Sequence, residues 1–344
     1  GIRHSSTSRG LGDVYKRQTE HAECWGCVDS TRRQKIDNTK EVRILLLVNE
    51  SASSVTARTR VLIQTALAEH HDVELAMTSR RGHASRIARG AASTGTDIVV
   101  VLGGDGTLNE AANGLAGTDC ALAALPGGST NVFARTIGMN DDPLEATKQT
   151  ITAINQNSIK SVGLGEVSGR YFLFHCGNGF DAAVVKQVER RSALKRYAGH
   201  PLFMWCGFDT WLRHYDRSSP RMRIDHSAGG ITDSYFTIIL NTDPYTYLGS
   251  RPLSLAPSTN LESRLSVVAL RSMALKTMLT LLSDLFKGKP LENDDRIHIS
   301  TDLDAISVTG HMPFPYQLDG DHLGSVEELN FKWQPEIMRL VAPT

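Results

Sequence analysis

Three apolar runs of strand length, separated by helix-like segments, most strongly limit what the first half of this chain can fold into. The runs are VRILLLVN (42–49), DIVVVL (97–102) and CALAALP (120–126). Each lacks the alternation of a half-exposed strand, so each is expected to be buried on both faces of a sheet. The intervening stretch HASRIARGAAS (83–93) has the composition of a helix. Strands that alternate with helices predict βαβ units, and hence a parallel sheet flanked by helices.

The second half of the chain follows a different pattern. Short strand-like stretches separated by turn residues dominate after about residue 158, among them RMRIDH (221–226) and RLSVVAL (264–270). This pattern is typical of a mostly antiparallel β-sandwich or barrel. Two stretches interrupt it as predicted helices, AGHPLFMWCGFDTWLRHY (198–215) and MALKTMLTLLSDLFKG (273–288).

These patterns predict a division of the chain into parts. Residues 1–40 are rich in Arg, Ser and Gly without periodicity, so we expect a disordered tail or sequence foreign to the protein. We expect an α/β domain at 41–157, a β-rich domain at 158–332, and a segment at 333–344 that returns to the first domain.

Composition excludes several classes of protein. The formal net charge is +0, whereas proteins that bind nucleic acid usually carry a basic excess, so no nucleic-acid partner is expected. Five cysteines indicate a reducing, cytoplasmic setting, and the single CxxC pair Cys24–Cys27 is weak support for zinc. No apolar run reaches the length of a membrane span, so any membrane contact is expected at the surface.

The loop GGDGT (103–107) directly follows the second buried run. Glycines let a ligand approach the backbone, and free N–H groups ahead of a helix form an anion site, so phosphate is the expected guest. Asp105 would repel phosphate unless a metal ion bridges the two groups or the carboxylate orients a hydroxyl. The structural alternative is a tight turn in which Asp105 caps a helix.

A second glycine loop, LPGGSTNVFAR (125–135), follows the next buried run. Loops after neighbouring parallel strands meet at the same sheet edge, so the two loops could together hold a di- or triphosphate. Ser129, Thr130 and Asn131 would supply polar contacts, although they are also ordinary helix-capping residues.

An acidic pair, Asp319 and Asp321, flanks a glycine near the C-terminus. A carboxylate within reach of a substrate hydroxyl can accept its proton during attack on a phosphoryl group. The alternative is a plain hairpin turn, for which Asp-Gly is a common sequence.

Taken with GGDGTLNE (103–110) and PGGSTN (126–131), the motifs GNGFDAAVV (177–185), NTDPYTYLGSRPLSLAP (241–257) and QLDGD (317–321) resemble the diacylglycerol kinase catalytic domain. This family includes bacterial diacylglycerol and other lipid kinases and is related to sphingosine and ceramide kinases. The resemblance runs from about residue 42 to the C-terminus.

The resemblance implies an α/β domain like those of NAD kinase and phosphofructokinase, followed by the β-rich lipid-substrate domain. It implies a phosphotransferase of bacterial phospholipid biosynthesis, which moves the γ-phosphate of Mg²⁺-ATP to the hydroxyl of diacylglycerol or a related lipid. Asp321, helped by Asp319, would accept the proton, and Asp105 would be catalytic and hold Mg²⁺. The implied ATP contacts are Asn49, Thr78, Gly103, Gly104, Asp105, Gly106, Thr107, Leu108, Asn109, Gly128, Ser129, Thr130 and Asn131.

The sequence also departs from the family pattern. The first loop reads NESAS (49–53), which keeps Asn49 but lacks the usual proline and glycine, and Asp321 stands where glutamate is common. His83 and Val132 stand where Asp is frequent. A structural Mg²⁺ site of some bacterial members uses Asp-Gly where this chain has Glu262-Ser263, so this second metal is doubtful.

A lipid substrate implies a cytoplasmic protein that visits the inner membrane face as a peripheral protein. The aromatic stretch 204–215 and the amphipathic stretch 278–286 could touch a bilayer, or their faces could pack on the β-rich domain. An NAD kinase-like enzyme and a non-catalytic nucleotide-binding regulatory protein remain alternative functions, and a homodimer remains open.

Overall fold

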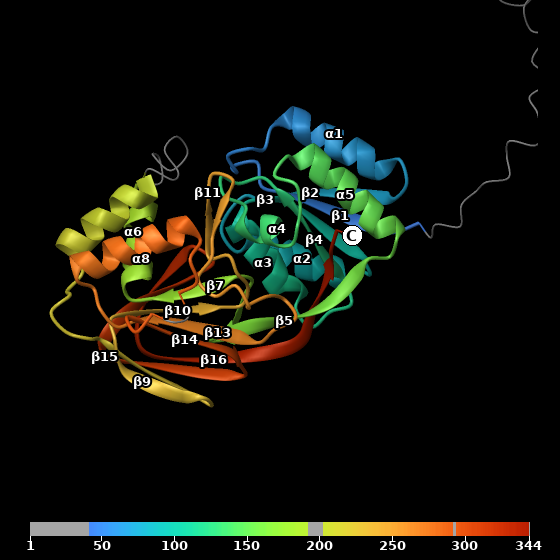
Figure 1. Cartoon of the computed structure of the whole chain (residues 1–344). Helices are drawn as coiled ribbons and strands as arrows, with labels where there is room; N and C mark the ends of the chain where they lie inside the picture. Colours follow the sequence, from blue (N-terminus) through green and yellow to red (C-terminus); the bar gives the residue numbers. More distant parts are fainter. Residues whose placement is uncertain (1–40, 192–201, 292–293, 344) are drawn as a thin grey trace, which may run out of the picture. The chain divides into compact units, whose positions relative to one another are not determined.

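The computed structural model describes residues 41–191, 202–291 and 294–343 (Figure 1). The predicted tail and the Cys24–Cys27 pair therefore lie outside the described residues. Residues 41–344 form one compact unit, whose first part is α/β and whose second part is rich in strands.

The first part alternates strands and helices as the apolar runs predict. Its elements are β1 Arg43–Val48, α1 Ala57–Ala68, β2 Asp72–Met77, α2 His83–Ser93, β3 Ile98–Gly103, α3 Asp105–Leu115, β4 Ala121–Pro126, α4 Val132–Thr136 and α5 Pro143–Asn155.

Capping side chains fix where two of these helices begin. The Thr56 hydroxyl accepts a hydrogen bond from the backbone N–H of Thr59 at the start of α1. Asp142 does the same for two N–H groups at the start of α5, where Pro143 occupies the first turn. Such caps satisfy donors that a helix N-terminus leaves without partners.

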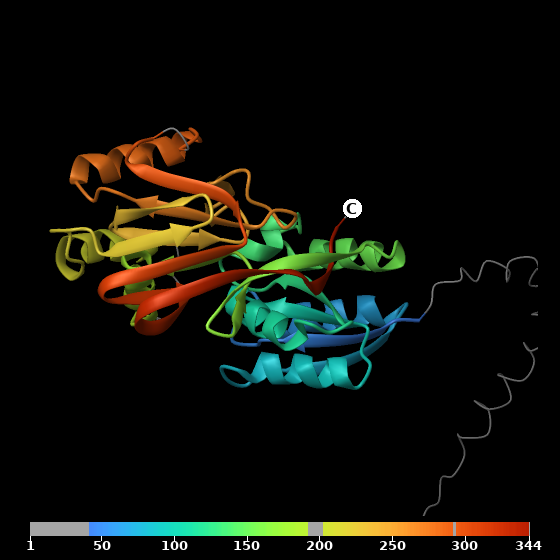
Figure 2. The ribbon, with the colours of Figure 1, turned by 90° about the horizontal axis from the view of Figure 1, so that it is seen from below.

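Strands β1 to β4 pair in parallel in the order β2-β1-β3-β4. Strands β3 and β4 are buried along their whole length, which explains their continuous apolar sequence. Helices α1 and α5 contact each other, as do α2 and α3, and the two pairs cover opposite faces of the sheet (Figure 2). This arrangement brings the ends of β3 and β4, with their glycine loops, to one edge.

The second part consists mainly of strands, with helices at its surface (Figure 1). Residues 202–209 are helical and continue into the π-helix η1. The remaining elements are β5 Ile159–Val167, β6 Arg170–Phe172, β7 His175–Asn178, α6 Phe180–Glu189, η1 Thr210–His214, β8 Met222–His226, β9 Gly229–Ser234, β10 Phe236–Leu240, β11 Thr246–Leu248, β12 Arg251–Leu253, β13 Leu265–Leu270, α8 Leu275–Lys287, β14 Ile297–Leu303, β15 Ala305–Leu318 and β16 Asp321–Val341.

Strand β16 connects the two parts. Its first half pairs antiparallel with β15, while Arg339 and Leu340 near its end pair parallel with Ala121 and Leu122 of β4. It also pairs antiparallel with β5. The predicted parallel sheet is thus present in β1 to β4. These C-terminal residues and β5 extend it as a mixed sheet that continues into the β-rich part.

Within the described residues, no helix has both the length and the apolar character needed to cross a membrane.

Candidate functional site

The two glycine loops lie against each other at the ends of β3 and β4. Gly103 is in register with Pro126, and the N–H of Gly127 donates to the carbonyl oxygen of Gly103 at 2.9 Å. A Cβ on Gly127 would come 2.8 Å from the Gly103 nitrogen, and a Cβ on Gly128 would come 2.8 Å from the Gly104 Cα. Glycine is thus required here for the contact between the loops, in addition to any approach by a ligand.

Asp105 connects the two loops through its side chain. Its carboxylate accepts hydrogen bonds from the backbone N–H groups of Val132 and Phe133, both at 3.1 Å. These N–H groups belong to the first turn of α4, where a carboxylate is stabilised by the positive end of the helix. We expected Asp105 to face a metal-bound nucleotide and not to cap a helix. The second half of this expectation is wrong, because the Asp105 side chain caps α4. Its role as a Mg²⁺ ligand stays a prediction.

Asn49 and Thr107 are brought together from two different loops. The Asn49 side-chain amide donates to the Thr107 hydroxyl at 2.8 Å, and the Asn49 side-chain oxygen accepts from the Ser51 N–H at 3.0 Å. The altered loop NESAS therefore keeps the asparagine in contact with the first glycine loop.

Other predicted residues surround the same edge of the sheet. Thr78 follows β2, and its N–H donates to the carbonyl oxygen of Val48 at 2.9 Å. Ser129 is exposed and Thr130 is half-buried. Asn131 braces its own loop, because its side-chain oxygen accepts from the N–H of Gly128 at 2.7 Å. Ser129 is thus the most accessible of the three polar residues of this loop.

Two predicted nucleotide contacts have side chains that point into the protein. Leu108 is 4% exposed and belongs to the apolar core. Asn109 is 3% exposed, and its side-chain amide donates to an Asp319 carboxylate oxygen at 2.7 Å and to the Tyr171 carbonyl at 2.9 Å. We therefore correct the assignment of the Asn109 side chain from a nucleotide contact to a positioning residue for Asp319.

Asp319 is buried and surrounded by donors. Its carboxylate accepts from the backbone N–H groups of Leu173, Phe174 and His175 at 2.7–3.0 Å, and from Asn109. Burial raises its pKa to about 7, against the opposite influence of these four donors. With 4% exposure and four donors, the Asp319 carboxylate anchors the loop that carries Asp321. Its role as a helper of the proton acceptor stays a prediction.

Asp321, two residues later, faces the glycine loop. A Cβ on Gly106 would lie 3.7 Å from an Asp321 carboxylate oxygen, and a quarter of the Asp321 side chain is exposed. Its carboxylate pairs with Arg81 at 2.7 Å, and Glu189 lies 3.5 Å from the same guanidinium nitrogen. The pKa of Arg81 is raised, mainly by its hydrogen bond to Asp321. We call residues 319–321 the acidic loop. The acidic loop of the β-rich part and the first glycine loop of the α/β part therefore lie against each other.

Gln317 connects the acidic loop to α6. Its side-chain oxygen accepts from the N–H of Gly320 at 2.7 Å, and its side-chain nitrogen donates to a carboxylate oxygen of Asp181 at 2.7 Å. The hydroxyl of Tyr245 donates to the other oxygen of Asp181. The motifs at 177–185, 241–257 and 317–321 thus form one connected, buried support for the loop.

Sequence reasoning missed Arg81 and the structural roles of Glu110 and Arg135. Glu110 accepts from two N–H groups at the start of α2, and Arg135 donates to the carbonyl of Gly249 at 3.0 Å while its guanidinium covers the ring of Tyr247. The only sequence signal for Arg81 was its place directly before a glycine and a helix. The contacts of Arg135 join the second glycine loop to the β-rich part.

The described residues do not form a Mg²⁺ site from protein side chains alone. Across 41–191, 202–291 and 294–343, no three His, Cys, Asp or Glu side chains gather as metal ligands. Mg²⁺ in proteins is often held by one or two carboxylates together with substrate phosphates. The carboxylates near the glycine loops are those of Asp105 and Asp321. A Mg²⁺ ion bound there would need further ligands from substrate phosphates.

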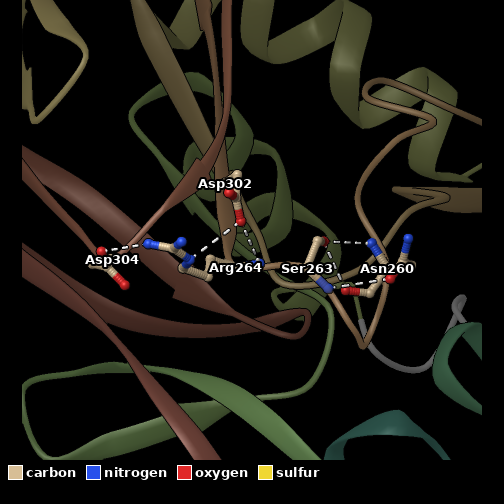
Figure 3. A network of polar contacts seen from close by, with 5 residues as sticks. All are labelled: Asn260, Ser263, Arg264, Asp302 and Asp304. Atoms are coloured by element: carbon tan, nitrogen blue, oxygen red, sulfur yellow. Dashed lines mark hydrogen bonds and ion pairs between the residues drawn. The ribbon is translucent and has the colours of Figure 1, made fainter.

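The place of the second, structural Mg²⁺ site does not fit that ion. Figure 3 shows the network formed there by Asn260, Ser263, Arg264, Asp302 and Asp304. The guanidinium of Arg264 lies 3.3 Å from Asp302 and 2.6 Å from Asp304, so both carboxylates already pair with a cation. The Glu262 side chain is 87% exposed, and its carboxylate lies 4.0 Å from the Lys160 amine.

Comparison with known proteins found relatives of the part of the chain that carries the two glycine loops. Residues 43–167 match the model of the diacylglycerol kinase catalytic domain. The chain is 37% identical over 105 residues to a diacylglycerol kinase of Bacillus subtilis, covering 30% of this chain and 33% of that protein. It is 31% identical over 170 residues to a Pseudomonas aeruginosa protein named "Probable lipid kinase YegS-like", covering 49% of this chain and 53% of that one.

A solved structure of a diacylglycerol kinase from Bacillus anthracis has a similar fold, with a TM-score of 0.66 over 88% of this chain and 98% of that one, at 22% identity. The sequence matches span between a third and about half the length of the curated relatives. Residues 43–167 are therefore similar in sequence to the diacylglycerol kinase catalytic domain.

Proposed function

We propose that this protein is an ATP-dependent lipid kinase that phosphorylates the hydroxyl of diacylglycerol or a related lipid. The observation that carries the proposal is the position of Asp321, whose carboxylate lies beside Gly106 of the first glycine loop. A phosphate held by that loop would therefore lie next to a carboxylate that can accept a proton.

The two glycine loops supply the phosphate end of the proposed site. Backbone N–H groups that precede a helix attract anions, and α3 follows the first loop directly. Ser129 adds an exposed hydroxyl in the second loop. When Mg²⁺ is bound with the nucleotide, it neutralises charge on the phosphates, and the residues of this chain position the reacting groups.

The acidic loop supplies the acceptor end. The lipid hydroxyl oxygen forms a bond to the γ-phosphorus while the bond from that phosphorus to the β-phosphate oxygen breaks, and ADP leaves. The hydroxyl proton passes to the carboxylate of Asp321. Asp319 does not touch the reactants; its four hydrogen bonds hold the loop so that Asp321 faces Gly106.

The test is transfer of labelled phosphate from ATP to diacylglycerol dispersed in detergent. Asp321→Asn should lower kcat about a hundredfold or more, since a positioned general base contributes roughly 10² to 10⁴. The matched control is Asp225→Asn, a surface carboxylate of β8 paired with Arg223, which should keep the wild-type rate.

Other outcomes would overturn the proposal. Efficient formation of NADP from NAD and ATP would support the NAD kinase-like alternative. ATP binding by calorimetry without transfer to any lipid alcohol would support a non-catalytic regulatory protein. An unchanged rate in Asp321→Asn would remove that residue as the proton acceptor. A lipid substrate also requires peripheral contact with a membrane at the cytoplasmic face, and the surface for that contact is argued next.

A further inference from the structure

Residues 202–214 carry an unusual number of apolar side chains in solvent. Five of them, spread over the helix at 202–209 and η1, are between 37% and 58% exposed: Phe203, Met204, Trp205, Phe208 and Leu212. The opposite side of the same helix is buried through Leu202 and Cys206. The alternative in which this aromatic stretch packs its apolar residues on the β-rich part is therefore contradicted for these five.

Helix α8 shows the same division. Thr277 and Leu281 are buried, whereas Leu275, Leu279 and Leu282 are 49%, 58% and 42% exposed. Spacings of four and three residues place the three leucines on one side of the helix. A helix with one apolar face against the core and further leucines in water is not explained by folding alone.

The two helical segments form one surface. The indole N–H of Trp211 donates to the carbonyl of Met273, directly before α8, at 3.2 Å. A hollow of about 520 Å³ lies between the residue that follows the first segment, Tyr215, and the residues that directly precede α8, Met273 and Ala274. Figures 1 and 2 both place α8 and residues 202–214 on the side away from β1 and β2. Together we call the exposed apolar residues of 202–214 and of α8 the apolar face. They are Phe203, Met204, Trp205, Phe208, Leu212, Leu275, Leu279 and Leu282.

Basic side chains border the apolar face. Arg213, Lys276 and Lys287 are exposed. The acidic groups nearby are paired: Asp209 is buried with Arg213 within 3.5 Å, and Asp284 lies 3.0 Å from Lys289. A surface with apolar side chains in the middle and cations at its border is complementary to a bilayer that contains anionic lipids.

Helix α6 connects the apolar face to the acidic loop. Val184 and Val188 of α6 pack on Leu202 and Cys206. At the end of the same helix, Glu189 accepts from the N–H of His322, next to Asp321. One helix thus separates the apolar face from the carboxylate that the proposed reaction uses.

We propose that the apolar face docks this protein on the surface of a bilayer that contains anionic lipids. The apolar side chains enter the boundary between headgroups and acyl chains, and the basic residues contact the anionic headgroups. The purpose of such docking rests on the proposed function, because a diacylglycerol substrate lies in that boundary. Vesicle binding can nevertheless be measured without any kinase assay.

The experiment is sedimentation of the full chain with vesicles. One set contains phosphatidylcholine alone, and the other contains about 30% phosphatidylglycerol as the anionic lipid. The test variant is Phe208→Ser with Leu279→Ser, which removes the two side chains of the face that are 58% exposed. The matched control is Val61→Ser with Leu62→Ser on α1, where the two side chains are 52% and 45% exposed.

The wild type and the α1 control should bind the anionic vesicles, and added salt should weaken this binding. The Phe208/Leu279 variant should bind about tenfold more weakly. Equal binding of both double variants, or no binding of the wild type, would overturn the inference. So would a wild-type dimer in solution that only the Phe208/Leu279 variant dissociates, because a second copy would then cover the face.

Kinase assays separate the two proposals. If docking is right, the Phe208/Leu279 variant keeps its rate on diacylglycerol in detergent micelles and loses rate on vesicles. If vesicle binding follows the expectation but no lipid is phosphorylated in either form, the proposed function fails and the docking surface stands.

Discussion

The surroundings of Asp319 and of Asp321 differ sharply, although only Gly320 separates them. Asp319 is enclosed by three backbone N–H groups and the Asn109 amide, and it is 4% exposed. Asp321 lies at the open side of the same turn, against Arg81 and the first glycine loop. One carboxylate is used to hold the loop, and the other is left where a ligand can reach it.

This difference teaches that an acidic pair in a sequence need not act as a pair. The buried carboxylate accepts four hydrogen bonds, so changes there should affect folding first. The open surroundings contain an exposed ion pair, so changes there should affect reaction rate with little loss of stability. The following predictions test that division, from the largest expected effect to the smallest.

Asp319→Asn should lower the free energy of unfolding by about 4 kcal/mol, because the amide nitrogen leaves two of the four buried donors without an acceptor. Urea unfolding monitored by circular dichroism measures the change. The exposed control Asp225→Asn should cost less than about 1 kcal/mol. If both variants lost the same small amount, Asp319 would not be an anchor.

His175, next to the same anchor, predicts how stability depends on pH. Burial lowers its pKa from 6.5 to about 4. A lowered folded-state pKa gives stability that is present above pH 6.5 and is lost as the pH falls toward 4. The stability advantage of the wild type over His175→Gln should therefore shrink by roughly 2–3 kcal/mol between about pH 7 and pH 4.5.

The comparison with His175→Gln cancels the opposite contribution of Asp319, whose raised pKa favours folding at low pH. Unfolding curves at several pH values provide the measurement, with the exposed His311→Gln as control. A difference between wild type and His175→Gln that does not change with pH would contradict the burial argument.

Gly127→Ala tests the contact between the two glycine loops. Its Cβ would stand 2.8 Å from the Gly103 nitrogen, so we expect a loss of about 2 kcal/mol in stability from overpacking. The separated loops should also raise the KM for ATP.

The matched control for Gly127→Ala is Gly90→Ala inside α2, where no atom lies within 4 Å of the new Cβ. This change should stabilise the protein by about 0.5–1 kcal/mol, since alanine favours a helix. Wild-type stability and an unchanged KM in Gly127→Ala would show that the loops tolerate separation.

Arg81→Ala tests the open side. The guanidinium holds the carboxylate of Asp321 at 2.7 Å, so its loss should lower kcat roughly three- to tenfold through misplacement of that carboxylate. Thermal stability should change by less than about 1 kcal/mol, because Arg81 is 63% exposed. Steady-state kinetics and thermal unfolding check both, with the neighbouring Arg80→Ala as control. A rate loss that merely follows a loss of stability would contradict a positioning role.

Much of the α/β part was predictable because its signals are local. The buried strands β3 and β4 can be recognised from continuous apolar runs, and α2 matches its predicted range 83–93. The β-rich part was predictable in character but not in pairing. Strand β16 joins β15, β5 and β4, and no short window of sequence specifies partners so distant along the chain.

The sequence by itself determined the glycine loops and the acidic pair, and it showed the similarity of residues 43–167 to the diacylglycerol kinase catalytic domain. Each is a short stretch whose residue types carry the signal. Only the tertiary structure decided which acid is buried. Asn109 reaches Asp319 across 210 residues of chain, and Arg81 reaches Asp321 from the loop before α2. Contacts of this kind arise from packing, which places side chains by the fold and not by their neighbours in sequence.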